Sequence, residues 1–327
     1  MVKYILVVLT GAADLTSSQL SERTPLQAAK MPHLHFFAKM GKVGSYLPFS
    51  DRLAPSADLA LYSLLGYDAS KEYPGRAAFE AANAELQCEE NEVVFCTNFI
   101  TESEGHLTDA KAGGISSKEA KALINFLNKK LASDFVRFYG GSEYRHLTMI
   151  KDSHGYKALS AKTYDPRLIE GGKLPDILPK GPGEELLKKL MFDAKLLLQD
   201  HEVNEVRVDL GENPANMLWL WGQGRTCELA ALSDKYVFNS GAVIATREFA
   251  RGMGSLAGLT VLDIKQEGLE YAEYYEKISK LSLDVMEEKD FLLLHLHAAD
   301  EAALAGDLNG KVSALESIDF FIFSKLR

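Results

Sequence analysis

Runs of apolar residues divide the chain into three parts. The first part opens with Tyr4–Leu9 (YILVVL), which is apolar on both alternating faces and predicts a central strand covered on both sides. From about Cys88 the apolar period changes to two, so residues 92–101 predict a half-buried strand, and an amphipathic helix follows over 118–131. The third part alternates helical and continuous apolar patterns and contains the strand-like run FLLLHLH at 291–297.

Helix and strand patterns that alternate on both sides of a middle block predict an α/β fold. We expect a mostly parallel sheet with helices on both faces, of the alkaline-phosphatase type, and an inserted smaller α+β domain. Glycine and proline are concentrated between residues 171 and 183, which marks the return to the first domain. The predicted domains are therefore 1–87 with 176–327, and an insert over 88–175.

Composition and charge exclude several classes of partner. The 327 residues carry a formal net charge of −10, which disfavours nucleic acid and an anionic membrane as partners. A locally basic pocket for a small anion is compatible with that charge. The three cysteines form no CxxC motif, and their odd number is typical of a reducing compartment, so we expect a cytoplasmic protein.

The most informative stretch runs from residue 55 to residue 86. It contains a short polar loop, Pro-Ser-Ala-Asp at 55–58, directly before an apolar helical run. A second entry, Gly75-Arg76, leads into an alanine-rich helix. A loop that opens into a helix presents free backbone N–H groups and the positive helix end, a geometry that suits a phosphate group.

This stretch, together with TPLQAA at 24–29, HEVNEVR at 201–207 and PANMLWLWGQGR at 214–225, resembles the archaeal-type cofactor-independent phosphoglycerate mutases. That family belongs to the alkaline phosphatase superfamily. The resemblance implies metal-dependent phosphoryl transfer through a serine, which interconverts 3-phosphoglycerate and 2-phosphoglycerate. It also implies two divalent metal ions, Mn, Mg or Zn, because a metal lowers the pKa of the serine and stabilises phosphoryl charge.

The residues that the resemblance makes catalytic are mostly replaced. The nucleophile position is Ala57, and the metal-ligand positions carry Thr10, Leu304 and Ala305, while Asp300 is retained. We therefore predict a non-catalytic relative with a binding or scaffold role and with no bound cofactor. Two alternatives stay open: an active phosphotransferase with a rearranged site, and a subunit completed by a partner chain.

Several residues are candidates for binding a small phosphorylated metabolite or another anion. Arg76, Arg145 and Arg225 offer bidentate forks for phosphate or carboxylate, although surface or interdomain salt bridges would also explain them. Asn98 and Asp58 fall on positions that match the family and are further candidates.

Two features point to other kinds of contact. His295 and His297 are two residues apart on a predicted strand, which is metal-ligand spacing, but core or interface histidines are the favoured interpretation. The chain also looks shorter at its C-terminus than its relatives. An uncovered sheet edge would favour a homo-oligomer or a partner protein.

Overall fold

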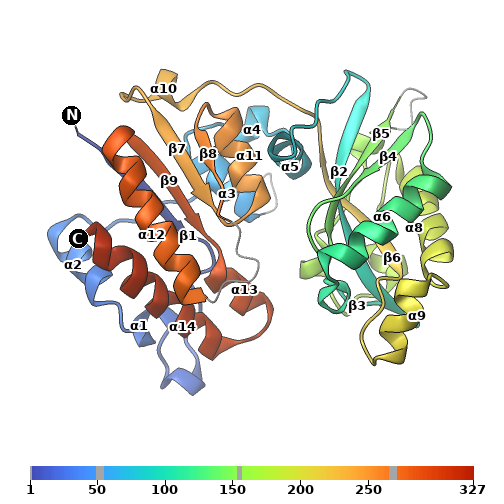
Figure 1. Ribbon diagram of the computed structural model, residues 1–327, viewed down its shortest axis with the longest axis horizontal. Helices are drawn as coiled ribbons and strands as arrows, with labels where there is room; N and C mark the ends of the chain where they lie inside the picture. The colour runs from blue at the N-terminus through green and yellow to red at the C-terminus, as the bar shows by residue number, and fades with distance from the viewer. Residues whose placement is uncertain (1, 49–54, 153–156, 265–270) are drawn as a thin grey trace. The chain divides into compact units, whose positions relative to one another are not determined.

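The chain forms two compact units, each described here by itself. The computed structural model describes residues 2–48, 55–152, 157–264 and 271–327. One unit combines Met1–Tyr73 with Glu228–Arg327, and the other is Pro74–Cys227 (Figure 1). We call them the parallel-sheet unit and the antiparallel-sheet unit.

The parallel-sheet unit contains four parallel strands in the order β1-β9-β7-β8. In chain order they are β1 (Tyr4–Leu9), β7 (Gly241–Ala245), β8 (Thr260–Leu262) and β9 (Phe291–Leu296). Its α-helices are α1 (Pro25–Ala28), α2 (Pro32–Met40), α3 (Ala57–Leu64), α4 (Ala69–Glu72), α10 (Leu232–Lys235), α11 (Glu248–Leu256), α12 (Tyr271–Glu288), α13 (Ala298–Leu304), α14 (Leu308–Ile318) and α15 (Ser324–Leu326). A 3-10 turn, η1 (Ser18–Leu20), follows β1, and a π-helical segment, η5 (Asp319–Phe323), joins α14 to α15.

Helices cover both faces of this sheet (Figure 1). On one face, Tyr275 and Ile278 of α12 pack in the same core cluster as Leu292 and Leu294 of β9. On the other face α11 lies so close to β7 that a Cβ atom on Gly254 would meet the side chain of Val243 at 2.5 Å. The expectation of a parallel sheet between two helical layers is confirmed.

The expected place of Tyr4–Leu9 in the sheet is wrong. Among the described residues β1 pairs only with β9 and lies at the edge, and the side chains of Ile5 to Leu9 are half-buried. An apolar run on both faces is typical of a central strand. The composition of β1 therefore reports how apolar its surroundings are, but not how many strands pair with it.

The antiparallel-sheet unit is organised around its longest strand, β2 (Glu92–Ser103). β2 pairs with three other strands, and the order β3-β2-β5-β4 is completed by β6 on β2. The other strands are β3 (His106–Asp109), β4 (Val136–Tyr139), β5 (Arg145–Lys151) and β6 (Met217–Gly224). The α-helices are α5 (Arg76–Asn83), α6 (Ser117–Leu131), α7 (Leu174–Ile177), α8 (Glu184–Leu198) and α9 (Glu202–Asp209), and the 3-10 turns are η2 (Ala112–Gly114), η3 (Ala158–Ser160) and η4 (Pro166–Leu168).

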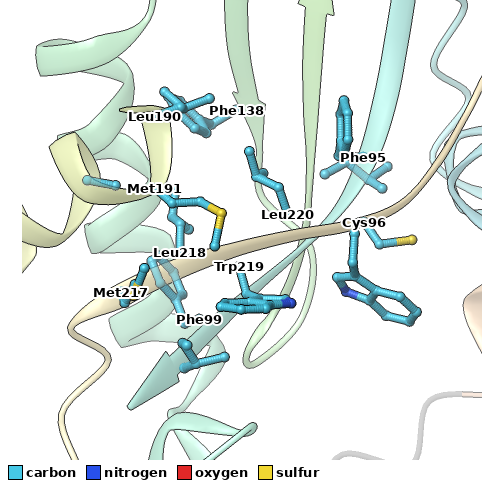
Figure 2. Close-up of a cluster of buried hydrophobic side chains, with 14 of the residues drawn as sticks. Phe95, Cys96, Phe99, Phe138, Leu190, Met191, Met217, Leu218, Trp219 and Leu220 are labelled. Atoms are coloured by element: carbon cyan, nitrogen blue, oxygen red, sulfur yellow. The ribbon is translucent and has the colours of Figure 1, made fainter. Parts of the chain in front are cut away.

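A large apolar core lies in this unit. Figure 2 shows part of it, with side chains of β2, β4, β6 and α8 in one cluster. Trp219 of β6 and Phe95 and Phe99 of β2 are fully buried there. The apolar period of two predicted a half-buried strand over 92–101; the strand is there, but β2 is buried on both faces because helices and neighbouring strands pack around it. The capping box at Ser116 and Glu119 starts α6 close to where the amphipathic pattern placed it.

The unit is larger than the expected insert. We predicted an insert over 88–175, but the compact unit is Pro74–Cys227. The physical reason is the pairing of β6 with β2, with Asn98 opposite Trp219, which brings α8, α9 and β6 into the antiparallel sheet. The glycine- and proline-rich stretch at 171–183 is therefore an internal turn of this unit.

The HEVNEVR segment has a structural role in this unit. The side-chain amide of Asn204 is buried; its Nδ2 donates to the carbonyls of Leu198 and Ala215 at 2.8 and 3.0 Å, and its Oδ1 accepts from the Ala215 N–H. Arg207 is also buried and bonds the carbonyls of Ala112, Gly113 and Asn213. These two side chains connect the ends of α8, β6 and η2.

We predict that Asn204→Ala destabilises the antiparallel-sheet unit by about 2–4 kcal/mol, because it removes three buried hydrogen bonds and takes their side-chain partner from both the N–H and the carbonyl of Ala215. Both tryptophans lie in this unit, so indole fluorescence during urea unfolding reports it. The exposed neighbour Glu205→Ala is the control and should change the midpoint little. Equal effects of the two variants would contradict the role given to Asn204.

Candidate functional site

The loop that enters α3 carries the position expected for a nucleophile. Ala57 is the first residue of α3 and has no side-chain oxygen. The adjacent hydroxyl of Ser56 accepts a hydrogen bond from the Leu59 N–H at 3.3 Å and caps the helix. Asp58 is buried in the first helical turn, and the hydroxyl of Tyr73 donates to its carboxylate. The polar groups of this loop therefore stabilise the start of the helix.

The carboxyl edge of the parallel sheet holds Thr10 and Asp300, two of the positions that the resemblance assigns to metal ligands. Thr10 follows β1, and its Oγ1 lies 2.9 Å from Nε2 of His295. Asp300 lies 2.9 Å from Nε2 of the buried His297. Burial lowers the pKa of His297, although Asp300 opposes this effect. The edge therefore presents paired side chains.

One lysine and one arginine form ion pairs with two further acidic residues at this edge. The Lys311 ammonium is buried and pairs with Asp14, and this hydrogen bond lowers the pKa of the Asp14 carboxyl. Arg247, at the start of α11, pairs with Glu301 at 2.6 Å. Leu304 and Ala305, at the end of α13, are exposed apolar residues without a donor atom.

The weak prediction of a metal at His295 and His297 has no support from this arrangement. The two rings stack with centroids 6.0 Å apart, and their Nε2 atoms face Thr10 and Asp300 respectively. Within the part of the chain that the structure describes, no three His, Cys, Asp or Glu side chains are placed to hold a metal ion.

A second candidate region lies in the antiparallel-sheet unit, where β6 meets α5. A Cβ atom on Gly75 would lie 2.0 Å from the Gln223 carbonyl oxygen, and one on Gly224 would lie 2.4 Å from the Pro74 oxygen. Only glycine permits this backbone approach. It sets Arg76, the first residue of α5, against the indole of Trp221, with the guanidinium carbon 5.1 Å from the ring centroid.

Arg167 joins Arg76 at the same indole. Its guanidinium carbon lies 5.6 Å from the Trp221 ring centroid. Burial lowers the pKa of Arg167, but the Asp165 carboxylate, which binds Nε and Nη2, outweighs this effect and raises it, while nearby Arg76 lowers it. Sequence reasoning missed Arg167, because nothing in the local pattern indicates that residues 76, 167 and 221 meet.

Arg145 lies beside these groups in the sheet. It is the β5 residue opposite Asn98 of β2, and its guanidinium carbon lies 4.9 Å from the Tyr144 ring. The Tyr144 side chain also interacts electrostatically with Arg167 and raises the pKa of that guanidinium. We call Arg76, Arg145 and Arg167, with Trp221, the arginine cluster.

The other predicted contacts are placed differently. The Oδ1 of buried Asn98 accepts a hydrogen bond from the Trp221 indole N–H at 3.1 Å. Arg225 is exposed, and its backbone N–H donates to the Pro74 oxygen. Asp58 belongs to the other unit and is held by Tyr73. Of the three predicted arginines, Arg76 thus contacts the Trp221 indole, and Arg145 is connected to that indole through its strand partner Asn98.

Similarity to named proteins now identifies the family. The family model described as 2,3-bisphosphoglycerate-independent phosphoglycerate mutase matches residues 38–204. The protein of that name from Methanosarcina mazei is 35% identical over 97% of this chain and 79% of its own length. The one from Methanosarcina acetivorans is 34% identical over 99% of this chain and 81% of its own length. The chain belongs to this family.

Solved structures agree with this assignment. The cofactor-independent phosphoglycerate mutase from Thermoplasma acidophilum is 27% identical, with a TM-score of 0.53 over all of this chain and 83% of that one. A Pyrococcus horikoshii protein, 22% identical, has a TM-score of 0.72 over all of this chain and 79% of its own, and shows the shared fold. No described helix has the length and hydropathy needed to cross a membrane.

The divalent metals typical of this family do not fit the donor set of the described sheet edge. A divalent ion needs several deprotonated oxygen or imidazole ligands around one point. Here Thr10 offers only a hydroxyl, Asp14 is bound by Lys311, and the side chains of Leu304 and Ala305 offer no ligand atom. These described residues therefore do not form the set of ligands that a divalent ion requires.

The buried histidine beside the arginine cluster gives a pH prediction. Burial lowers the pKa of His146 to about 3, and its Nδ1 accepts the Gly141 N–H, so the folded protein holds the ring neutral. The unfolded chain binds a proton near pH 6.5. The contribution of His146 to the free energy of unfolding is therefore fully present well above pH 6.5. It falls by about 1.4 kcal/mol per pH unit as the pH drops from 6.5 towards 3.

His146→Gln should remove this slope, although it lowers stability at pH 7. Urea midpoints of both proteins at pH 7, 6 and 5, followed by indole fluorescence, measure the difference. Parallel decreases in the two proteins would show that His146 does not titrate as described.

Proposed function

We propose that this chain is a non-catalytic member of the phosphoglycerate mutase family that binds a small anion through the arginine cluster. The first part is supported by Ala57, which stands where the resemblance implies the nucleophile and has no side-chain oxygen, and by the adjacent hydroxyl of Ser56, which caps the helix. Phosphoryl transfer through this loop would need an oxygen nucleophile, and neither residue supplies one there.

The state of the acidic side chains supports the same proposal. Asp14 is paired with Lys311, Glu301 with Arg247, and Asp300 lies against His297. A metal ion would have to displace these partners, one of which is a buried ammonium. Breaking such a pair leaves a buried charge without compensation, which costs several kcal/mol.

The anion-binding part of the proposal rests on two guanidinium groups at one indole. Like charges held close together in a poorly solvated place are favourable only when negative charge is near. Glu80 and Asp165 supply part of that charge, through contacts of 2.7 and 2.9 Å. Arg76 also stands at the first turn of α5, where the helix dipole favours an anion. A phosphorylated metabolite has suitable chemistry.

The location and partners are also proposed. Cys88, Cys96 and Cys227 carry free thiols, which supports a reducing compartment such as the cytoplasm. The apolar edge of β1 supports a homo-oligomer or a partner protein, because such edges are otherwise prone to pairing.

We predict that the purified protein, equilibrated with Mn²⁺ or Zn²⁺, retains no stoichiometric metal and converts 3-phosphoglycerate no faster than a protein-free blank. Metal content is measured by mass spectrometry and turnover by a coupled assay. Ala57→Ser should also be inactive, because restoring the hydroxyl does not restore the ligands missing at Thr10 and Leu304. About two metals per chain, together with turnover, would establish the rearranged active site instead.

Turnover that appears only in a complex purified from the native source, and not in the chain alone, would favour completion by a partner chain. Both of these results would overturn the non-catalytic proposal.

We predict that inorganic phosphate and 3-phosphoglycerate bind the arginine cluster. Replacing Arg145 by Gln should weaken binding by about 10- to 100-fold, the effect of losing one charge-assisted hydrogen bond. For Arg76, the double variant Arg76→Gln/Glu80→Gln avoids leaving the buried Glu80 unpaired and should weaken binding similarly. Isothermal titration calorimetry measures the affinities.

Arg137→Gln is the matched control for these variants. Arg137 belongs to the same unit but pairs with Glu92, away from the contacts of the cluster, and its loss should leave anion affinity unchanged. Equal losses in Arg137→Gln and Arg145→Gln would mean that net charge, not this cluster, governs binding.

A further inference from the structure

Trp221 is the side chain that the two best-buried guanidinium groups of the arginine cluster share. Arg76 of α5 and Arg167 of η4 are far apart in the sequence, and their guanidinium carbons lie 5.1 and 5.6 Å from the indole centroid. The favourable cation–π interaction at such distances is largest for tryptophan and for poorly solvated sites. Trp221 is 7% exposed.

Each of the two forks is fixed in two ways. Nε of Arg76 bonds Glu80 at 2.7 Å, and Nε and Nη2 of Arg167 bond Asp165. The carboxylate fixes one edge of each planar group, and the indole fixes its face. The orientation of both arginines therefore depends on the plane of one indole ring.

The plane of that ring is fixed by Asn98. The indole N–H is a donor only, and its acceptor is Oδ1 of Asn98 at 3.1 Å. Asn98 is 3% exposed and lies in β2 between Arg145 on one neighbouring strand and Trp219 on the other. An indole N–H left unpaired at this depth would favour a different ring orientation.

We propose that Trp221 is the platform of the anion site and that Asn98 is its positioning residue, acting through the indole N–H and not by contact with the ligand. This inference rests on the proposed anion binding. It assigns Asn98 a different role from the direct substrate contact that the sequence suggests. It also adds Arg167 and Trp221 to the residues on which anion affinity depends.

Fluorine NMR of the full chain labelled with 5-fluorotryptophan tests the positioning step without a ligand. The chain has two tryptophans, so two signals are expected, and Trp221→Phe identifies the signal of Trp221. Asn98→Ala should shift that signal more than the Trp219 signal, because Trp221 loses its indole acceptor, whereas Trp219, the cross-strand neighbour of Asn98, keeps its hydrogen bond to the Tyr164 carbonyl. Asn98→Asp keeps an acceptor oxygen and should restore the Trp221 signal towards its original position.

A double-mutant cycle with inorganic phosphate tests how Asn98 acts. Asn98→Ala should weaken phosphate binding about 10-fold in the natural chain, the effect of one buried hydrogen bond. In a Trp221→Phe background the indole N–H is already absent, so Asn98→Ala should change affinity less than about 2-fold. Trp219→Phe, in the same strand, is the control and should leave phosphate affinity unchanged.

Each outcome decides between the alternatives. Equal losses in both backgrounds would mean that Asn98 touches the anion directly, and an unshifted Trp221 signal in Asn98→Ala would mean that the indole is held by packing alone; both overturn the positioning role. If the natural chain binds no phosphate, the proposed function fails, whereas the fluorine signals still accept or reject the link between Asn98 and Trp221.

Discussion

The arrangement of the arginine cluster depends on the pairing of β2 with both β5 and β6. Asn98 of β2 lies opposite Arg145 on one side and Trp219 on the other, so a single strand sets the positions of residues from two distant parts of the sequence. A shift of one residue in either pairing would turn every side chain to the opposite face. The large apolar core on this sheet prevents such a shift, because Phe95, Phe99 and Leu218 would then lose their buried positions.

The carboxyl edge of the parallel-sheet unit is stabilised by contacts within the chain. The strands still end at one edge, where α/β proteins bind their ligands. Salt bridges and hydrogen bonds within the chain bind the groups that remain there, as in the pairs of Asp14 with Lys311 and of Arg247 with Glu301. These contacts compensate the charges of Asp14 and Glu301 within the chain, without a ligand.

Much of the fold could be predicted from the sequence, because local patterns carry it. The period of two along β2 and the capping box of α6 are such patterns, and the order of motifs was sufficient for the family. The domain boundary was not predictable in this way, because a helix-strand alternation at 184–224 looks the same whether β6 joins the parallel sheet or pairs with β2. For β1 the apolar run was recognised, but a sequence pattern does not reveal which strands lie beside it.

The candidate site was predictable only where single residues carried the information. Ala57 needs no tertiary context, because an alanine has no side-chain oxygen wherever it lies. Arg76 and Arg145 were found by residue type, whereas Arg167 required knowledge that its turn reaches Trp221. Asn98 was a candidate because its position matches the family, but its partner Trp221 could not be known, since the hydrogen bond spans 123 residues of sequence.

The charge balance of the cluster bears on how such a site would bind. Each of its three arginines has a carboxylate nearby: Glu80 for Arg76, Glu143 for Arg145 and Asp165 for Arg167. These acids reduce the attraction for an incoming anion, but they also hold the forks in place before it arrives. Ordering a flexible arginine on binding costs about 0.5–1.5 kcal/mol. Guanidinium groups that are already held in place avoid that cost. The cluster should therefore distinguish its ligands by their shape and by bidentate contact more than by their net charge.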